Sequence, residues 1–401
     1  MALIRRGTVE VISEDELRQK LITARDEDRP LRVKLGLDPT APDIHLGIAV
    51  VLRKLRLFQD LGHEVIIIIG DFTAAIGDPS GKSKTRPQLS VDEIQANAKT
   101  YEKQYCQILE PEKTQVVFNS EWLDRLTFSD VIKLTARTTV ARVLERDDFV
   151  QRLEKNTSIG VHEILYPICQ GYDSVVLKAD IEMGGTDQKF NNLMGRDLQR
   201  ADGQEPQVVL LMPLLVGLDG TEKMSKSLGN YVGIYESSND MYGKLMSIPD
   251  ELIFTYFELT TDVPLDEIHE MQSALNNGEL HPKVAKQRLA REVVSTYSHQ
   301  DAAQAAETHF ERVHKHKELP TNIPEITISK QNFIDGKIWI AHIIMESNFA
   351  QSSSEAIRLV KQGAVRLNGE RITDDKATID VKNEVLQVGK RKFARLILSS
   401  T

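Results

Sequence analysis

"LRVKLGLDPTAPDIHLGIAVVLRKLRLFQDLGHEVIIIIGDF", residues 31–72, contains the pattern that determines the fold class. Residues 31–38 and 63–72 at its two ends are predicted strands. The second is apolar throughout, which is typical of a strand covered on both faces. The segment between them has helical periodicity, with Asp43 as the expected N-cap and Gly62 at its end. A strand, a helix and a strand in this order predict a parallel β-α-β unit.

Further strands extend this unit at residues 114–120, 181–185 and 207–215. A capping box of Ser90 and Glu93 predicts a helix through Leu109. Residues 129–178 are expected to be mostly helical, and a helix over 187–199 separates the last two strands. The fold class is therefore α/β. We expect a Rossmann-like doubly wound parallel sheet over residues 1–235, with a helical insertion near 120–180.

The chain beyond residue 235 changes character twice. Glycine and proline are sparse over 236–315 and the period is helical, which predicts an α-helical domain. Two prolines interrupt "HKELPTNIPEITISK" (316–330), so residues 316–334 are expected to form a linker. Residues 335–401 predict a small α+β domain, with helices over 339–347 and 353–363, a strand over 364–372 and a β-rich tail.

Composition excludes several classes of protein. The 401 residues include only two cysteines, Cys106 and Cys169, so a disulfide framework is excluded and a cytoplasmic location is expected. Cysteine and histidine never occur at metal-ligand spacing, so we expect no protein-bound metal. The longest apolar run, Val65–Ile69, is too short to cross a bilayer, and the N-terminus lacks the apolar core of a secretory signal.

Charge is distributed unevenly along the chain. The net charge is −9, which argues against indiscriminate binding of nucleic acid. From Asp335 to the end, 11 Lys and Arg face 8 Asp and Glu, a balance of +3, and the remainder therefore carries −12. A basic C-terminal segment on an acidic body predicts a local site for a polyanion.

Residues 38–48, "DPTAPDIHLGI", follow the first strand and open the first helix. The carboxyl end of a parallel strand and the free N–H groups of a helix N-terminus together favour phosphate binding. Thr40 and His45 add hydrogen-bonding side chains, and Gly47 leaves room for a ribose or a base against the backbone. A lone histidine at this position also fits a role in capping or packing.

Residues 70–85, "GDFTAAIGDPSGKSKT", match a phosphate-binding P-loop only in part. The P-loop pattern requires a glycine five residues before Gly81, where this chain has Ile76. A carboxylate at Asp78 suits an ammonium group better than a phosphate. The segment therefore argues against a P-loop kinase, and a simple turn over 77–81 is the alternative to a binding site.

Polar side chains also gather in "YPICQGYD" (166–173) and "GGTDQ" (184–188). The spacing of Tyr166, Gln170 and Asp173 places them on one helical face. A phenol, an amide and a carboxylate on one face indicate ligand binding, with a solvated helix surface as the alternative. Asp187 and Gln188 follow a strand, so they should emerge at the carboxyl edge of the sheet.

The segment "DGTEKMSKSLGN" (219–230) follows the last strand of the predicted sheet. It contains Lys223 and Lys226 among hydroxyl side chains, between Gly220 and Gly229. The pattern fits either a solvated loop or a loop that brings two ammonium groups to a polyphosphate.

Taken together, these segments resemble the class I aminoacyl-tRNA synthetases of the tyrosyl type. "HLGI" (45–48) stands where that class has its HIGH motif, and "KMSKS" (223–227) is identical to its second signature. "GLDPTAPDIHLG", "GDPSGKS", "YPICQGYD" and "GGTDQ" are similar to tyrosyl-type elements. "SSSEAIRLVKQGAVRLNGERI" (352–372) resembles an S4-type RNA-binding module. The resemblance covers nearly the whole chain.

The resemblance implies that L-tyrosine is activated with ATP to tyrosyl-adenylate and passed to tRNA(Tyr), with Mg²⁺ entering as part of the ATP complex. The implied catalytic residues, which contact the phosphates, are Thr40, His45, Lys223 and Lys226. The implied ATP contacts also include Asp38, Gly47, Gly185 and Asp187. The implied tyrosine-binding residues are Gly36, Asp78, Tyr166, Gln170, Asp173 and Gln188, where Asp173 accepts from the phenol. The candidate tRNA contacts are Arg366, Arg371, Lys390, Arg391 and Lys392.

Two positions depart from the family pattern. Ile48 replaces the second histidine of HIGH, so any ATP contact from that side chain is lost. Lys34 stands where many members have a tyrosine that helps to bind the phenol, and it is either an alternative donor or points elsewhere. The family's insertion usually builds a homodimer. Two other interpretations stay open: a tryptophanyl-type synthetase, and a non-enzymatic RNA-binding protein on a synthetase scaffold.

Overall fold

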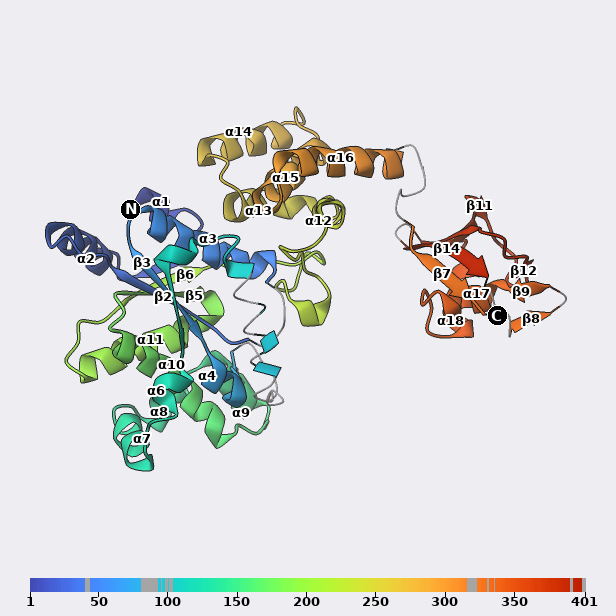
Figure 1. Ribbon diagram of the computed structural model, residues 1–401. Coiled ribbons are helices and arrows are strands. Elements are labelled where there is room, and N and C mark those ends of the chain that lie inside the picture. Colours follow the sequence, from blue (N-terminus) through green and yellow to red (C-terminus); the bar gives the residue numbers. More distant parts are fainter. Residues whose placement is uncertain are drawn as a thin grey trace. The chain divides into compact units, whose positions relative to one another are not determined.

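The computed structural model describes residues 1–39, 44–80, 93–94, 96–97, 100, 104–315, 323–329, 332–334, 336–389 and 392–398. The chain divides into two compact units, Met1–Glu307 and Thr308–Thr401. Figure 1 shows the elements of each unit. Among the helices of the described residues, none is both long enough and apolar enough to span a membrane.

A six-stranded sheet lies at the centre of the first unit (Figure 1). Its order is β1-β6-β5-β2-β3-β4, and every pair is parallel except β1 with β6. The parallel strands have the doubly wound order, which reverses direction between β2 and β5. The strands are Glu10–Ile12 (β1), Arg32–Leu37 (β2), Glu64–Ile69 (β3), Thr114–Phe118 (β4), Ile181–Gly185 (β5) and Val208–Met212 (β6). The predicted parallel sheet is confirmed, while the short edge strand β1 was not predicted.

Helices cover both faces of this sheet. Helix α3 (Leu46–Asp60) connects β2 to β3, and α11 (Lys189–Ala201) connects β5 to β6. The two connections run in opposite directions across the sheet, so right-handed crossovers place the two helices on opposite faces. Residues Val65–Ile69 of β3 are all buried between these layers, which confirms the prediction from their apolar run.

Helix α3 begins later than predicted. It starts at Leu46 after His45, and Asp43 lies outside the described residues. The segment before it pairs with the chain that follows KMSKS. The N–H of Leu46 donates to the carbonyl of Val232 at 2.9 Å, and the N–H of Ile234 donates to the carbonyl of Ile44 at 3.1 Å. These backbone bonds hold Ile44 and His45 extended, which delays the first helical turn.

A helical insertion follows β4 and ends in the long helix α10. A buried ion pair anchors the start of α10, where Arg152 contacts Glu163 at 2.7 and 2.9 Å. Glu163 also accepts a 2.7 Å hydrogen bond from the backbone of Gly160. The insertion helices are Ser120–Leu123 (α6), Phe128–Thr135 (α7), Val140–Val143 (α8), Asp147–Glu154 (α9) and Val161–Leu177 (α10).

Several smaller elements complete the sheet region. The helix predicted through Leu109 ends at Tyr105 among the described residues, and Ser90 of its capping box lies outside them. The remaining elements are Ala2–Arg5 (α1), Glu14–Asp26 (α2), Asp71–Ile76 (α4), and the short 3₁₀ helices Pro111–Lys113 (η1), Thr186–Gln188 (η2), Lys226–Leu228 (η3) and Asp250–Leu252 (η4).

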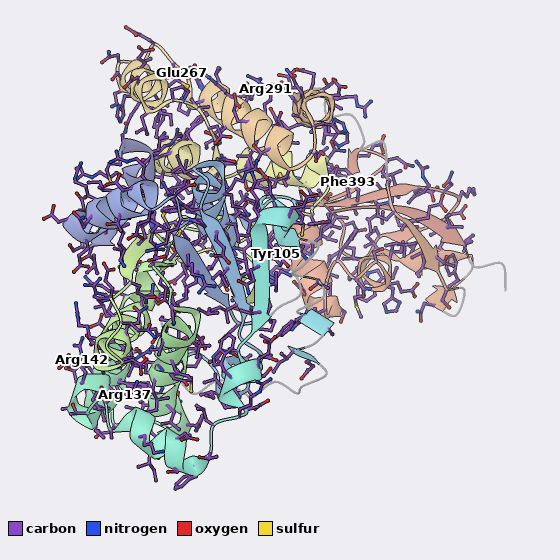
Figure 2. The ribbon with its side chains drawn as sticks, turned by 60° about the vertical axis from the view of Figure 1, so that its left-hand side comes forward. Tyr105, Arg137, Arg142, Glu267, Arg291 and Phe393 are labelled. Atoms are coloured by element: carbon purple, nitrogen blue, oxygen red, sulfur yellow. The ribbon has the colours of Figure 1, made fainter. Side chains whose placement is uncertain are left out.

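The helical segment after the sheet has the predicted character. Arg288 pairs with Glu267 at 2.6 Å and Arg291 with Glu307 at 2.6 Å, and Glu267 and Arg291 are labelled in Figure 2. The first unit includes this segment up to Glu307. Its independence as a 236–315 domain stays a prediction. The helices are Ser238–Leu245 (α12), Ile253–Thr260 (α13), Leu265–Asn276 (α14), Pro282–Tyr297 (α15) and Gln300–Lys315 (α16).

The second unit packs the two predicted helices, α17 (Ile340–Glu346) and α18 (Ser353–Lys361), against β-structure. Its sheets have the orders β11-β10-β13-β14-β7 and β12-β9-β8. The strand predicted over 364–372 is a hairpin, because Asn368 and Gly369 turn with φ of 48° and 86°. The strands are Glu325–Ile328 (β7), Phe333–Ile334 (β8), Lys337–Trp339 (β9), Val365–Leu367 (β10), Glu370–Arg371 (β11), Thr378–Ile379 (β12), Val385–Val388 (β13) and Lys392–Leu398 (β14).

Strand β7 lies inside the segment that was expected to be a linker. It pairs in parallel with β14, and Ile328 is fully buried in the core of the second unit. Residues 316–322 of the expected linker lie outside the described residues. A cut that keeps the second unit whole must therefore fall before residue 325 rather than at Asp335.

Candidate active site

A cavity of about 580 Å³ opens where β2 and β5 end, at the point where the strand order reverses. Thr40 lies outside the described residues. Every other residue predicted to contact ATP or tyrosine lines this cavity: Gly36, Asp38, His45, Gly47, Asp78, Tyr166, Gln170, Asp173, Gly185, Asp187, Gln188, Lys223 and Lys226. The helix α10 face is therefore a cavity wall, and the alternative of a solvated surface is wrong.

Two carboxylates form an acidic edge of this cavity. Asp38 accepts hydrogen bonds from the hydroxyls of Thr73 and Tyr166, both at 2.8 Å. Asp78 accepts from the amide of Gln188 at 2.9 Å. Burial and the neighbouring Asp38 raise the pKa of Tyr166, so its phenol keeps the proton that it donates. Such fixed carboxylates suit an ammonium ligand.

Asp173 lies at the buried end of the same wall and is 3% exposed. It accepts a 2.8 Å hydrogen bond from the indole of Trp122 and a 3.4 Å hydrogen bond from the amide of Asn119. Burial raises the pKa of Asp173 to about 7, although the charge of Lys34 and the two donors act in the opposite direction. Sequence reasoning missed Asn119 and Trp122, because they belong to no motif and reach Asp173 only in the folded chain.

His45 lies on the opposite side of the cavity. Burial, and then the charges of Lys226 and Lys223, lower its pKa to about 4, so the imidazole is neutral near pH 7. A Cβ at Gly47 would lie 3.0 Å from Nδ1 of His45. Glycine is therefore needed here for packing of the imidazole as well as for open space. Ile48 also lines the cavity.

The two lysines of the KMSKS segment contact protein groups in this structure. Nζ of Lys223 lies 2.8 Å from the carboxylate of Asp187. Nζ of Lys226 lies 5.6 Å from the ring centroid of Tyr231, and Nζ of Lys244 lies 4.8 Å from the same centroid. These distances are within the range of cation–π attraction. The segment is therefore a structured part of the cavity, not only a solvated loop.

Side chains outside the motif hold the base of this loop. The side-chain oxygen of Asn230 accepts a 2.8 Å hydrogen bond from the backbone of Ser225, and the Asn230 amide donates to the carbonyl of Lys223 at 3.2 Å. Asp219 accepts from the backbone of Thr221 and of Glu222, both at 2.9 Å. These contacts fold the segment back toward the cavity.

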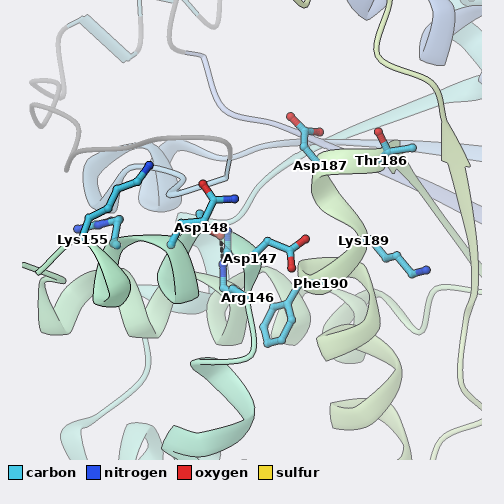
Figure 3. Close-up of a pocket in the computed structure, with 10 residues that line it drawn as sticks. Arg146, Asp147, Asp148, Lys155, Thr186, Asp187, Lys189 and Phe190 are labelled. Atoms are coloured by element: carbon cyan, nitrogen blue, oxygen red, sulfur yellow. Dashed lines mark hydrogen bonds and ion pairs between the residues drawn. The ribbon is translucent and has the colours of Figure 1, made fainter. Parts of the chain in front are cut away.

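A second cavity, of about 380 Å³, shares Asp187 with the first. Figure 3 shows its charged lining from α9 and from the start of α11. The guanidinium of Arg146 is almost fully buried there, 3.1 Å from Asp148 and 3.9 Å from Asp78. Arg146 thus connects the insertion to the acidic edge of the first cavity, a contact that the sequence did not predict.

Lys34 does not line the cavity, in contrast to the tyrosine that it replaces in the family pattern. Its side chain is fully buried, and Nζ lies 2.9 Å from the carboxylate of Glu182. The side chain is thus directed to Glu182 and not into the cavity, which fits the second alternative, in which Lys34 is not a donor to the ligand.

The basic residues predicted for tRNA contact are only partly described. Lys390 and Arg391 lie outside the described residues. Arg366, Arg371 and Lys392 are exposed. Arg371 also donates to the carbonyl of Gly363 at 2.9 Å, just after the end of α18. Their contact with RNA stays a prediction. Among the described residues, no group of three or more His, Cys, Asp or Glu could hold a metal ion.

Comparison with known proteins identifies two family regions. The family model for tRNA synthetases class I (W and Y) matches residues 26–315, and the S4 domain model matches residues 339–385. A solved tyrosyl-tRNA synthetase from Archaeoglobus fulgidus, complexed with L-tyrosine, superposes with a TM-score of 0.61 at 24% identity and covers 76% of this chain and 98% of its own. A truncated mitochondrial tyrosyl-tRNA synthetase from Aspergillus nidulans gives a TM-score of 0.62 at 21% identity, with coverage of 78% and 92%. These structures support the fold alone.

Curated relatives separate the tyrosyl from the tryptophanyl type. The tyrosine–tRNA ligase of Moorella thermoacetica is 57% identical over 397 residues, which are 99% of this chain and 95% of the relative. That of Carboxydothermus hydrogenoformans is 53% identical over 399 residues, 99% and 97% of the two chains. With this identity over nearly the full length, the chain belongs to the tyrosine–tRNA ligase family, a class I synthetase family, and carries a C-terminal S4 domain.

Proposed function

We propose that the protein activates L-tyrosine with ATP, releases pyrophosphate and transfers the tyrosyl group to the 3′ end of tRNA(Tyr). The observation that carries this proposal is the single cavity that joins an ammonium-binding edge, a buried carboxylate and the KMSKS lysines. This arrangement supports the binding of an amino acid beside a nucleoside triphosphate. An enzyme is also a better account of it than a non-enzymatic RNA-binding scaffold, because a decayed site would not keep all three parts.

Each side of the cavity has a separate task in this proposal. Asp78, Tyr166 and Gln170 hold the amino group of tyrosine, and Asp173 accepts the hydrogen bond of the phenol. The carboxylate of tyrosine then attacks the α-phosphate, and pyrophosphate leaves. Phosphoryl transfer of this kind depends on positioning and on neutralisation of charge. His45, with its pKa lowered to about 4, contributes a neutral hydrogen-bond donor, and the lysines contribute the charge.

ATP must replace the resting contact of Lys223. Asp187 is the proposed ribose ligand, and in the structure it is paired with Lys223 at 2.8 Å. When a ribose hydroxyl forms a hydrogen bond with Asp187, the ammonium group of Lys223 is released and can contact the phosphates. Mg²⁺ enters with ATP in this scheme. The proposed location of the reaction is the cytoplasm, where both tRNA and ATP are available.

A homodimer is proposed on a separate observation. Large apolar side chains are exposed on the insertion helices, where Phe128 is 81%, Val161 77% and Val140 62% exposed. Exposed apolar side chains that gather on one region commonly mark a protein interface. A second copy of this chain is the proposed occupant, as in the dimers of the family.

Tyrosine should drive ATP–pyrophosphate exchange in the presence of Mg²⁺, while tryptophan should not. Only tyrosine offers both an ammonium for Asp78 and a phenol for Asp173. The measurement is the exchange of labelled pyrophosphate into ATP with tyrosine, phenylalanine and tryptophan supplied separately. Exchange driven by tryptophan, or no exchange with any of them, rejects the proposed function.

The Lys226→Ala variant should lower kcat for exchange by about 10²–10³-fold, with a much smaller effect on the KM for tyrosine. The ammonium meets charge that develops mainly in the transition state, so its loss appears in kcat. Lys244→Ala is the matched control, because Lys244 contacts the same Tyr231 ring but does not line the cavity. A normal kcat with only a raised KM in Lys226→Ala contradicts the proposed role.

Truncation after Lys315 should leave exchange nearly intact and strongly reduce tRNA charging. The described cavity residues all precede residue 230, whereas β7 at residue 325 belongs to the second unit. The measurements are exchange, aminoacylation, and tRNA affinity at several salt concentrations. Phosphate contacts release counterions, so the full chain should show the steeper loss of affinity with salt. If the truncated protein charges tRNA as well as the full chain does, the second unit is not part of the tRNA-binding site.

Sedimentation of the purified chain should give the mass of a dimer, and the double variant Phe128→Asp, Val161→Asp should give a monomer. Two buried carboxylates without partners would cost more than the interface provides. Leu3→Asp, at an exposed position on α1, is the control and should stay dimeric. A wild-type monomer at micromolar concentration rejects the dimer.

A further inference from the structure

The floor of the proposed tyrosine pocket carries a buried charged pair on two neighbouring strands. Lys34 on β2 and Glu182 on β5 are direct partners in the parallel register, and both side chains are 0% exposed. Nζ of Lys34 lies 2.9 Å from Oε1 of Glu182. Two such charges are costly to bury, so a function for them is a reasonable expectation.

The alternation of side chains along each strand places this pair directly below the ligand space. Residues two apart on a strand point to the same face. On β2 that residue is Gly36, and on β5 it is Gly184, and both glycines line the cavity. A Cβ on Gly36 would meet no atom within 4 Å. Gly36 therefore leaves open space in the cavity, whereas a Cβ on Gly184 would lie 2.9 Å from Cβ of Gln188. Lys34 and Glu182 form the layer below these two glycines.

The two charges have different partners around them. Glu182 accepts hydrogen bonds from Gln170 at 3.1 Å and from Ser174 at 3.3 Å, and also from Gln207. By contrast, no acceptor in the described part of the chain meets Nζ of Lys34 with hydrogen-bond geometry. Three donors besides Lys34 thus hold the Glu182 carboxylate in place, and its negative charge offsets part of the field of the ammonium.

Asp173 is the group on which that field acts. Around Asp173 stand Lys34 from β2, Glu182 from β5, Asn119 and Trp122 near α6, and Tyr166 and Cys169 on its own helix. Asp38 and Asp78, which flank Tyr166, add negative charge nearby. Lys34 is the only cation in this described set. Among the influences that lower the pKa of Asp173, the charge of Lys34 is the largest.

We propose that Lys34 is a positioning residue for substrate specificity: its ammonium, held against Glu182 below the pocket, favours the ionised form of the Asp173 carboxylate, which accepts the phenol hydrogen of tyrosine. This inference rests on the proposed function, and in particular on tyrosine as the substrate. A hydrogen bond to an ionised acceptor is roughly twice as strong as one between neutral groups. Phenylalanine has no hydroxyl, so its use should not depend on the charge of Asp173.

The test is the pH dependence of kcat/KM for exchange, measured between about pH 5.5 and 9 with tyrosine and with phenylalanine. In the wild-type protein, kcat/KM for tyrosine should rise with pH through the pKa of Asp173, about 7, and phenylalanine should show no such rise. In Lys34→Met the rise should move to higher pH by about one unit or more, because an opposite charge has been removed. Discrimination between the two substrates at pH 7 should fall by about fivefold or more and recover in alkali.

Two further variants separate this role from a structural one. Glu182→Gln removes a negative charge and keeps the shape, so the rise should move to lower pH, opposite to Lys34→Met. The double variant Lys34→Met, Glu182→Gln has neither buried charge. Because Lys34 influences Asp173 more than Glu182 does, kcat/KM for tyrosine in the double variant should still rise at a higher pH than in the wild-type protein. Lys20→Met is the matched control. Lys20 is also buried, but it pairs with Glu205 and Asp180, and its loss should shift neither profile.

Two results of these measurements would overturn the proposal. The proposal is overturned if Lys34→Met loses kcat/KM equally for both substrates and keeps the wild-type pH profile. It is also overturned if the double variant has the wild-type pH profile, since Lys34 would then only neutralise Glu182. If Lys34→Met does not fold, the opposite shift in Glu182→Gln and the tyrosine-only rise in the wild type still decide it. Absence of any tyrosine-driven exchange in the wild type would instead reject the proposed function.

Discussion

The parallel pairing of β2 with β3 on one side and with β5 on the other determines the position of the ligand cavity. Because the connections leave β2 and β5 in opposite directions, a crevice opens at the carboxyl ends of these two strands. Asp38 stands at the end of β2, and Gly185 and Asp187 at the end of β5. Helix α10 is then held against the opening by the buried Arg152–Glu163 pair at its first turn. The cavity results from the strand order, and the residues of the sequence motifs line it.

Electrostatic balance is the second constraint on this site. Asp38, Asp78, Asp173 and Asp187 all line one cavity. In the described structure each is stabilised in a different way: Asp38 by two hydroxyls, Asp78 by Gln188 and Arg146, Asp173 by an indole and an amide, and Asp187 by Lys223. These carboxylates thus differ in burial and in the groups that meet them. One acidic pocket can therefore hold an ammonium, a phenol and a ribose at separate positions.

Much of this arrangement could be predicted from sequence because it depends on local periodicity. The β-α-β pattern of residues 31–72 was enough for the sheet, and the i, i+4, i+7 spacing was enough to place Tyr166, Gln170 and Asp173 on one wall. The contacts that the sequence did not predict are made by residues distant in the chain. Trp122 reaches Asp173 across 51 positions, and Arg146 approaches Asp78 from the N-cap of α9. The late start of α3 and the strand β7 likewise depend on partners, Val232 and β14, that no local pattern identifies.

The short ladder that joins the start of α3 to the chain after KMSKS has a mechanical consequence. One end of the stretch that carries Lys226 is fixed by Leu46 on Val232, and the other by the N–H of Met224 on the carbonyl of Leu215 at 2.7 Å. Because both ends of this stretch are fixed, the distance that it can extend depends on the number of its residues as well as on their chemistry. Residues 226–228 of this stretch form a short 3₁₀ helix, so loss of one residue there shortens it by about 2 Å, more than a hydrogen bond tolerates. The length of this stretch therefore fixes how far Lys226 can lie from the start of α3.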